Sequence, residues 1–198
     1  MRLGGQAGDT ALDKKRNPFS RKGLAMASNI QQANLRGLAT YLPAVGEARV
    51  EAFKQAYEDN RHRIYALAFW MTDNELAAEE LMKNTFCRAF ASSPDPGTEM
   101  MDRALVRELR ELMPLGTLTL ACDGANEVRS LRRNVKRVHL ECAVVQLPPT
   151  ERMIFLMHDV ERYDHGRIAR TLGINQQESA LGLHQARLRM RELLATMV

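Results

Sequence analysis

The sequence predicts an all-α protein made of two small helical domains joined by a linker. Three observations lead to this prediction. Apolar residues recur at steps of three, four and seven, which is the spacing of one helix face. Glycine and proline are sparse within these stretches and gather between them. A length of 198 residues, 45% of them hydrophobic, suits two cores of this size.

Residues 1–45 are predicted to form a basic, largely disordered N-terminal arm. Residues 1–40 hold seven Lys or Arg against two Asp, a net charge of +5, in a chain whose total net charge is +4. The segment lacks sustained periodicity and carries Gly, Asn, Ser and Pro, with at most a short helix around residues 29–38. The basic excess therefore lies in the arm rather than on the folded body. The sequence leaves open whether Met1 or Met26 is the natural start.

A first helical domain is expected over residues 46–113. Its first helix begins near Glu47, and its buried face is carried by Phe53, Tyr57, Ile64, Ala68 and Met71. Phe69 and Trp70, at the end of this helix, are expected to pack in the core.

The second and third helices of this domain follow from capping and turn residues. Asp73 is expected to cap a helix over about residues 74–91, whose candidate buried positions are Leu76, Leu81, Phe86 and Phe90. A turn over residues 92–97 comes next. Thr98 is expected to cap a third helix that runs to about Leu112, and Pro114 ends it.

Residues 114–137 are predicted to be a linker, because they show short alternation followed by a run of basic residues: Arg129, Arg132, Arg133, Lys136 and Arg137. A second helical domain is expected over residues 138–198. Its helices are predicted at 138–146, 150–160, 164–172 and 176–196.

The last two of these helices have the pattern of a helix-turn-helix. Ile168 and Ala169 can face inward, and the turn contains Gly173, which can adopt a left-handed conformation. Asn175 can cap the longer helix that follows. A short helix, a tight turn and a longer helix is the geometry that presents the second helix to the DNA major groove, although a plain helical hairpin has the same pattern.

Two stretches resemble a known family. LPPTERMIFLMHDVE (147–161), RIARTLGI (167–174) and LHQARLRMREL (183–193) resemble region 4 of a bacterial sigma factor, with the Leu-Pro-Pro, the Arg four residues after its first proline and the late Ala-Arg in place. RIYALAFWMTDNELAAEELMKNTFCRAFA (63–91) resembles region 2 of the same family. The chain is thus identified as a divergent member of the extracytoplasmic-function (ECF) sigma factors, over about residues 47–195.

The resemblance implies a transcription initiation factor with no catalytic activity of its own. The first domain, a region 2 three-helix bundle, would bind core RNA polymerase through Glu79, Glu80, Leu81, Lys83, Asn84 and Phe86. The second domain, region 4, would bind the upstream element of promoter DNA. Asn and Gln can read adenine edges and Arg can hold phosphate, so the predicted DNA-binding residues are Asn175, Gln176, Gln177, His184, Arg187 and Arg189. The family is commonly inhibited by an anti-sigma factor.

Several positions depart from the family pattern. Lys83 and Asn84 change the charge of the polymerase-binding face. The third helix, EMMDRALVRELRELM (99–113), lacks the aromatic residues on which flipped promoter bases would stack. Ala180, Gly182 and Gln185 stand on the recognition helix where family members often carry basic or small polar residues. Glu178, in its first turn, would repel phosphate.

These departures keep two alternative functions open. One is a sigma-like regulator without independent promoter melting, which mimics a sigma factor towards an anti-sigma factor or occupies polymerase without initiating. The other is a stand-alone helix-turn-helix regulator.

Other kinds of site find little support in the sequence. His158 and His165 match no strong metal-site spacing, and Cys87, Cys122 and Cys142 form no CxxC pair, so neither a metal nor a disulfide framework is expected. The chain has no nucleophile motif and no phosphate-binding glycine loop, and we expect no cofactor and no small-molecule substrate. It has no apolar run long enough for membrane insertion, and a cytoplasmic location is expected.

Overall fold

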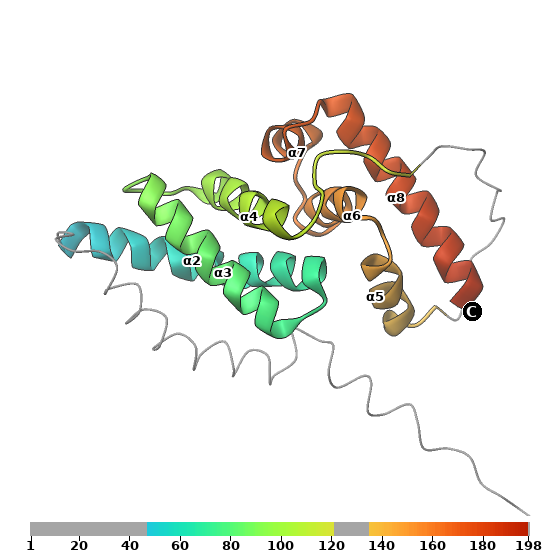
Figure 1. Cartoon of the computed structure of the whole chain (residues 1–198), viewed down its shortest axis with the longest axis horizontal. Helices are drawn as coiled ribbons and strands as arrows, with labels where there is room; N and C mark the ends of the chain where they lie inside the picture. The colour runs from blue at the N-terminus through green and yellow to red at the C-terminus, as the bar shows by residue number, and fades with distance from the viewer. Residues whose placement is uncertain (1–46, 121–134, 198) are drawn as a thin grey trace, which may run out of the picture. The chain divides into compact units, whose positions relative to one another are not determined.

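A computed structural model of the protein describes residues 47–120 and 135–197 (Figure 1). The predicted N-terminal arm, Cys122 and most of the basic run of the linker lie outside these residues. Within them the chain forms α-helices joined by short loops and no strand, which confirms the predicted all-α class. None of these helices is long and apolar enough to cross a membrane.

The first three helices, α2 (Glu47–Thr72), α3 (Glu75–Ser92) and α4 (Thr98–Leu112), pack together. The predicted buried face of α2 is confirmed, since all five of its residues are buried. An aromatic cluster joins α2 to α3: the Phe53 and Phe90 ring centroids lie 4.3 Å apart, and those of Tyr57 and Phe86 lie 4.8 Å apart. Trp70 is only half-buried and packs edge-on against Phe69.

The junction between α2 and α3 differs from the prediction in two respects. Asn74, not Asp73, caps α3, because its side chain accepts a hydrogen bond from the Ala77 N–H. Asp73 instead adopts a left-handed φ of 51° and donates its N–H to the Phe69 carbonyl, so it ends α2. Leu76 is 78% exposed, since the buried face of α3 runs through Ala78, Leu81 and Phe86.

Helix α4 begins one residue earlier than predicted, because its N-cap is Gly97 and not Thr98. Thr98 is its first helical residue. Its buried face carries apolar side chains, Met101, Leu105 and Leu109, together with two acidic ones, Asp102 and Glu108. Glu108 is held by Arg88 of α3.

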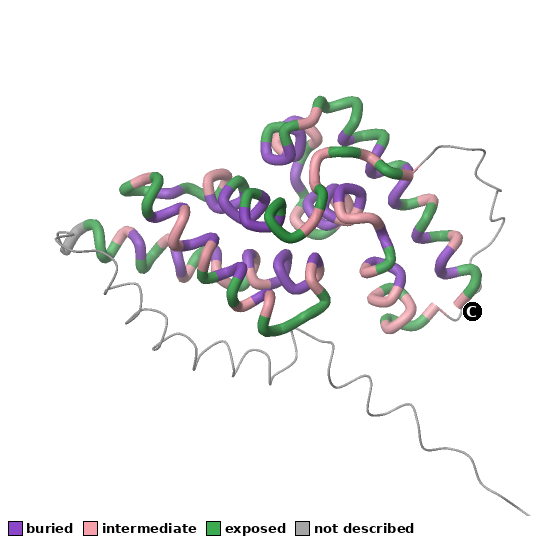
Figure 2. Tube along the Cα trace, viewed as in Figure 1, coloured by how far each residue is buried: buried purple, intermediate pink, exposed green. Residues whose placement is uncertain are grey.

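The C-terminal helices are α5 (Arg137–Val145), α6 (Pro149–Phe155), α7 (His165–Leu172) and α8 (Gln176–Met197). The predicted helix 150–160 is α6 followed by one π-helical turn, Leu156–Val160, in which the Glu161 N–H bonds to the Leu156 carbonyl. Helices α5, α6 and α7 all pack on α8. Each of these helices carries buried residues, which recur between exposed ones along α8 (Figure 2).

Residues 114–120, which we call the strap, leave α4 without forming a helix and pass alongside α8 (Figure 1). Together with residues 135–137, at the start of α5, they are the parts of the predicted linker 114–137 that the structure describes. The division into two domains at this linker stays a prediction.

Candidate nucleic-acid interface

The turn between α7 and α8 has the geometry that the sequence predicts. Asp164 caps α7 by accepting a hydrogen bond of 2.9 Å from the Arg167 N–H. Gly173 follows α7 with a left-handed φ of 64°, and the Ile174 N–H bonds to the Ala169 carbonyl. Ile168 and Ala169 are buried, as expected.

The first turn of α8 is closed by a reciprocal pair of hydrogen bonds. The Asn175 side-chain oxygen accepts from the Glu178 N–H at 2.7 Å, and the Glu178 carboxylate accepts from the Asn175 N–H at 2.8 Å. This arrangement is a capping box, which satisfies two backbone donors that the helix would leave free. Glu178 therefore stabilises the start of α8, a role that the sequence analysis missed and that the N-x-x-E spacing of Asn175 and Glu178 could have indicated.

Two close contacts set how α7 and α8 meet. A Cβ added to Gly166 would lie 2.9 Å from the Gln176 side-chain nitrogen, so the Gln176 side chain at the start of α8 reaches the start of α7. The ring nitrogen Nδ1 of His165 lies 3.0 Å from the Ser179 hydroxyl. These two contacts link the first turn of α8 to the start of α7.

All six predicted DNA-binding residues are exposed on or just before α8. Gln177, Ala180, His184 and Arg187 follow one another at steps of three or four, so they line one open side of the helix. Arg189 lies on another flank, where it pairs with Glu192 at 3.0 Å. The structure therefore groups the glutamines with His184 and Arg187, but not with Arg189.

Arg187 is held by an acidic side chain from the π-helical turn. Asp159 accepts hydrogen bonds from Arg187 at 2.5 and 3.0 Å and lies 2.9 Å from His158. Burial favours a higher pKa for Asp159, but the hydrogen bonds from Arg187 and His158 outweigh it, so its pKa lies below the usual value. This pairing orients Arg187 but also lowers the free positive charge that it offers to phosphate.

His158 and His165 stack with their ring centroids 4.9 Å apart. No cluster of three or more metal-ligating side chains occurs in the part of the chain that the structure describes. Burial, and then the charges of His158 and Arg187, lower the pKa of His165, while Asp164 opposes the shift. The lowered pKa of His165 favours its neutral form.

This lowered pKa predicts weaker stability in mild acid. The unfolded chain has the ordinary His pKa of about 6.5, so it binds a proton before folded His165 does. The stability that neutral His165 contributes is fully present above that pH and is lost as the pH falls through the lowered folded pKa. We expect the urea midpoint to fall from pH 7.5 to pH 5.5, and to fall less in His165→Gln. His62, whose pKa is also lowered, contributes equally to both proteins. An equal fall in both would contradict the prediction.

The other flank of α8 receives the strap. A Cβ added to Gly182 would lie 2.6 Å from Ile154 Cδ1 and 2.7 Å from Leu118 Cδ2, so Leu118 packs where a side chain would otherwise stand. Gln185 is buried and donates its amide hydrogen to the Leu120 carbonyl. Two of the three recognition-helix positions that depart from the family pattern, Gly182 and Gln185, therefore contact the strap.

Helix α6 binds the strap backbone through its first turn. The fully buried Glu151 carboxylate accepts from the N–H groups of Thr119 at 2.5 Å and Leu120 at 2.8 Å. The Thr150 hydroxyl accepts from the Gly116 N–H at 3.1 Å. The start of a helix favours a carboxylate, and this one holds two backbone donors at once.

The predicted polymerase-binding residues of α3 fall into two groups. Glu80 and Lys83 are exposed, and Glu79 and Asn84 are half-buried. Leu81 and Phe86 lie in the core, where Phe86 contacts the rings of Tyr57 and Phe90. The first group shares one accessible side of α3. Leu81 and Phe86 lie on the buried side of the helix and anchor it in the core.

Burial and the neighbouring Glu75 raise the pKa of Glu79. The open side of α3 carries acidic residues at its start, Glu75, Glu79 and Glu80, and a basic residue, Lys83, one turn later. Such a mixed surface suits a protein partner better than a nucleic acid.

Comparison with known proteins agrees with this arrangement. Residues 137–190 match the family model of sigma-70 region 4. Over 174 residues the chain is 24% identical to the ECF RNA polymerase sigma factor SigE of Mycolicibacterium smegmatis, covering 80% of this chain and 68% of that protein. The fold is similar to that of the sigma factor RpoE of Bartonella quintana, solved in complex with the anti-sigma factor NepR. The TM-score is 0.54 at 17% identity, over 72% of this chain and 96% of the other.

Proposed function

We propose that this chain, an ECF sigma factor, binds core RNA polymerase and directs it to promoters by binding their upstream element. The observation that carries the proposal is the match of residues 137–190 to sigma-70 region 4, because this segment contains the helix-turn-helix with its exposed polar side on α8. A non-enzymatic role follows, since the polymerase makes the RNA. The proposal places the protein in the bacterial cytoplasm, where the polymerase works.

Each half of the chain has a role in this proposal. The open side of α3, with Glu80 and Lys83, binds the polymerase. The open side of α8 enters the major groove, where Gln176 and Gln177 read base edges and Arg187 holds the backbone. The partners are core polymerase, promoter DNA and an anti-sigma factor.

Charge reversal on α3 tests the polymerase contact. We expect Glu80→Lys to weaken binding to core polymerase at least about tenfold, because like charges facing each other across an interface are strongly unfavourable. The measurement is co-elution of purified chain and core polymerase on size exclusion at moderate salt. Glu51→Lys, an equal charge reversal at an exposed site on α2, is the control and should co-elute as the wild type does. Failure of the folded wild-type protein to co-elute would overturn the proposal.

A second function is favoured by the composition of α4. This helix carries no aromatic side chain, so it offers no surface on which a flipped promoter base can stack. A chain that binds polymerase or an anti-sigma factor without melting DNA would need no such surface. The two functions differ in whether the chain supports transcription from a promoter.

A further inference from the structure

Asp159 is placed beside α8 by the π-helical turn Leu156–Val160. A π-helical turn bonds each N–H one residue further back than an α-helix does, and such turns are frequent at functional sites. The chain after the turn is held by its backbone, because the Tyr163 N–H bonds to the Met157 carbonyl at 3.0 Å. Asp159 thus approaches α8 from a separate element whose backbone is fixed.

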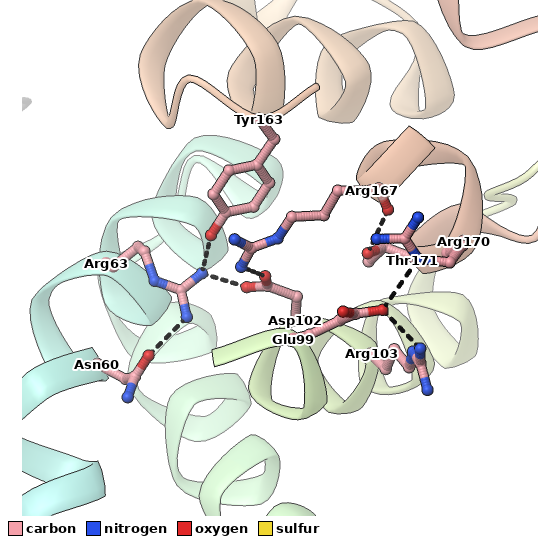
Figure 3. A network of polar contacts seen from close by, with 9 residues as sticks. All are labelled: Asn60, Arg63, Glu99, Asp102, Arg103, Tyr163, Arg167, Arg170 and Thr171. Atoms are coloured by element: carbon pink, nitrogen blue, oxygen red, sulfur yellow. Dashed lines mark hydrogen bonds and ion pairs between the residues drawn. The ribbon is translucent and has the colours of Figure 1, made fainter. Parts of the chain in front are cut away.

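The loop that follows this turn is anchored by a buried ion cluster (Figure 3). At the centre of the cluster, the fully buried Asp102 of α4 accepts hydrogen bonds from Arg63 of α2 and, at 2.6 Å, from Arg167 of α7. Tyr163, in the loop, accepts a hydrogen bond of 2.7 Å from Arg63, and its ring centroid lies 3.6 Å from the Arg167 guanidinium carbon. The chain therefore has a buried anchor shortly after Asp159.

The Asp159 carboxylate binds one edge of the Arg187 guanidinium. Its Oδ2 atom accepts from Arg187 Nε at 3.0 Å, and its Oδ1 atom accepts from Nη2 at 2.5 Å. Two parallel hydrogen bonds of this kind fix the plane of a guanidinium. The Nη1 atom has no hydrogen bond to any residue that the structure describes, and the Arg187 side chain is 47% exposed. Arg187 therefore presents its other edge to the solvent in a fixed orientation.

A second set of contacts holds the carboxylate on its other side. The Oδ1 atom of Asp159 lies 2.9 Å from Nδ1 of His158. The ring centroids of His158 and His165 lie 4.9 Å apart, and His165 Nδ1 lies 3.0 Å from the hydroxyl of Ser179, which is buried in α8. The row of contacts starts on α8 at Arg187 and returns to α8 at Ser179. Asp159 is thus held in place relative to the helix that it contacts.

Stability does not account for the pair of Asp159 and Arg187. Ion pairs between exposed side chains contribute little to stability. The carboxylate also partly neutralises a cation that DNA phosphate would attract. Arg189 offers a contrast, because it pairs with Glu192 of the same helix through one hydrogen bond of 3.0 Å. The property that distinguishes Arg187 is therefore its fixed orientation.

The position of Arg187 along α8 indicates a contact with the DNA backbone. The first residues of a recognition helix contact base edges in the major groove, and Gln177 lies in the first turn of α8. At about 1.5 Å of rise per residue, Arg187 lies about 15 Å beyond Gln177 on the same side of the helix. The major groove is about 12 Å wide, so a helix that enters it with its first turn carries Arg187 past the base edges to the phosphates.

We propose that Asp159 is a positioning residue for DNA recognition. It fixes the Arg187 guanidinium so that the free edge meets one backbone phosphate, and this contact sets the register in which Gln177 meets the bases. The proposal rests on the proposed binding of DNA by α8. It accounts for a carboxylate at a place where negative charge by itself opposes DNA binding.

Removal of the carboxylate should act in opposite directions on two kinds of binding. Asp159→Asn keeps the shape of the side chain and removes its charge, so the affinity for duplexes of unrelated sequence should rise about two- to fivefold. The guanidinium is then no longer fixed. The ratio of the affinities for a preferred duplex and for unrelated duplexes should therefore fall at least about fivefold.

The measurement uses the purified full-length chain and a pool of random duplexes at low salt. Rounds of binding enrich a preferred duplex, and fluorescence anisotropy then gives the dissociation constants of each variant for this duplex and for the unselected pool. Glu192→Gln is the control, because it removes an equal charge from a pair on another flank of α8 and should leave the ratio unchanged. Asp159→Glu keeps the charge and should restore part of the ratio.

A double variant separates positioning from a general structural role. Asp159 acts through Arg187, so Asp159→Asn should not lower the ratio further in a chain that already carries Arg187→Gln. An equal fall in both backgrounds, or an unchanged ratio in Asp159→Asn, would overturn the positioning role and leave DNA binding by α8 intact. If the wild-type chain enriches no sequence, the proposed DNA binding is overturned, and the positioning role with it.

Discussion

Replacing Arg152 with methionine is expected to lower the free energy of unfolding by about 2–4 kcal/mol, because hydrogen bonds to a charged group contribute about 1.5–3 kcal/mol and the carbonyls lose their shared donor. The Arg152 guanidinium donates to the carbonyls of Val145 and Leu147 before α6, and to those of Trp70 and Met71 at the end of α2. Methionine has a similar volume but no donor, so these carbonyls would lose their shared partner. Urea unfolding followed by circular dichroism measures the loss.

A lysine at the same position separates charge from geometry. Burial lowers the pKa of Arg152, with Asp73 opposing, yet a guanidinium stays charged at neutral pH. Arg152→Lys keeps the charge but cannot reach four carbonyls with one ammonium group. We expect it to recover less than half of the stability that Arg152→Met loses. Full recovery would show that charge alone matters and would contradict this account.

Replacing Glu151 with alanine is expected to lower the free energy of unfolding by about 2–4 kcal/mol, because each hydrogen bond to a charged group contributes about 1.5–3 kcal/mol. The carboxylate is the shared acceptor for the Thr119 and Leu120 N–H groups. If the strap detaches in this variant, the two N–H groups can bond to water, and this limits the loss of stability.

Hydrogen exchange distinguishes strap detachment from general unfolding. In Glu151→Ala the amides of Thr119 and Leu120 should exchange much faster, while the core of α3 around Phe86 keeps its protection. Glu192→Ala removes an exposed carboxylate from α8, the helix beside the strap, and should change neither exchange nor stability by more than about 0.5 kcal/mol. Unchanged strap exchange in Glu151→Ala would contradict the proposed role of the carboxylate.

The helices were predictable because their signals are local. The buried face of α2 follows from the spacing of Phe53, Tyr57 and Ile64, and the turn after α7 follows from Gly173 and the capping residue Asn175. Adjacent capping candidates were harder to separate. Asp73 and Asn74 are both good caps, and only the left-handed backbone at Asp73 decides that Asn74 begins α3.

The departures from the family pattern could not be explained from the sequence, because their partners lie far along the chain. Gly182 and Gln185 are matched to Leu118 and Leu120, about 65 residues away. Arg152 fits the family pattern in the sequence, but its contact with the Met71 carbonyl at the end of α2 spans 81 residues. Asp102 gave no signal, since one acid on a charged helix is usually solvated.

The candidate site was predictable only in part, because helix periodicity is a local signal and the partners of its side chains are distant in the sequence. The exposed positions of α8 follow from helix periodicity, and Gln176, Gln177 and His184 are accessible as expected. Periodicity could not show that Arg187 is bound by Asp159 from a separate turn. The DNA- and polymerase-binding assignments remain predictions that the experiments above address.

Transcription in vitro tests the central claim most directly. Core polymerase from the bacterium that encodes the chain is supplied with genomic DNA fragments, with and without the purified protein, and the RNA 5′ ends are mapped. The account predicts transcripts that require the chain and whose start sites share one upstream element, and their yield should fall with Gln177→Ala. A chain that co-elutes with polymerase but yields no transcript from any fragment would contradict promoter-directed initiation and leave the polymerase-occupying regulator in its place.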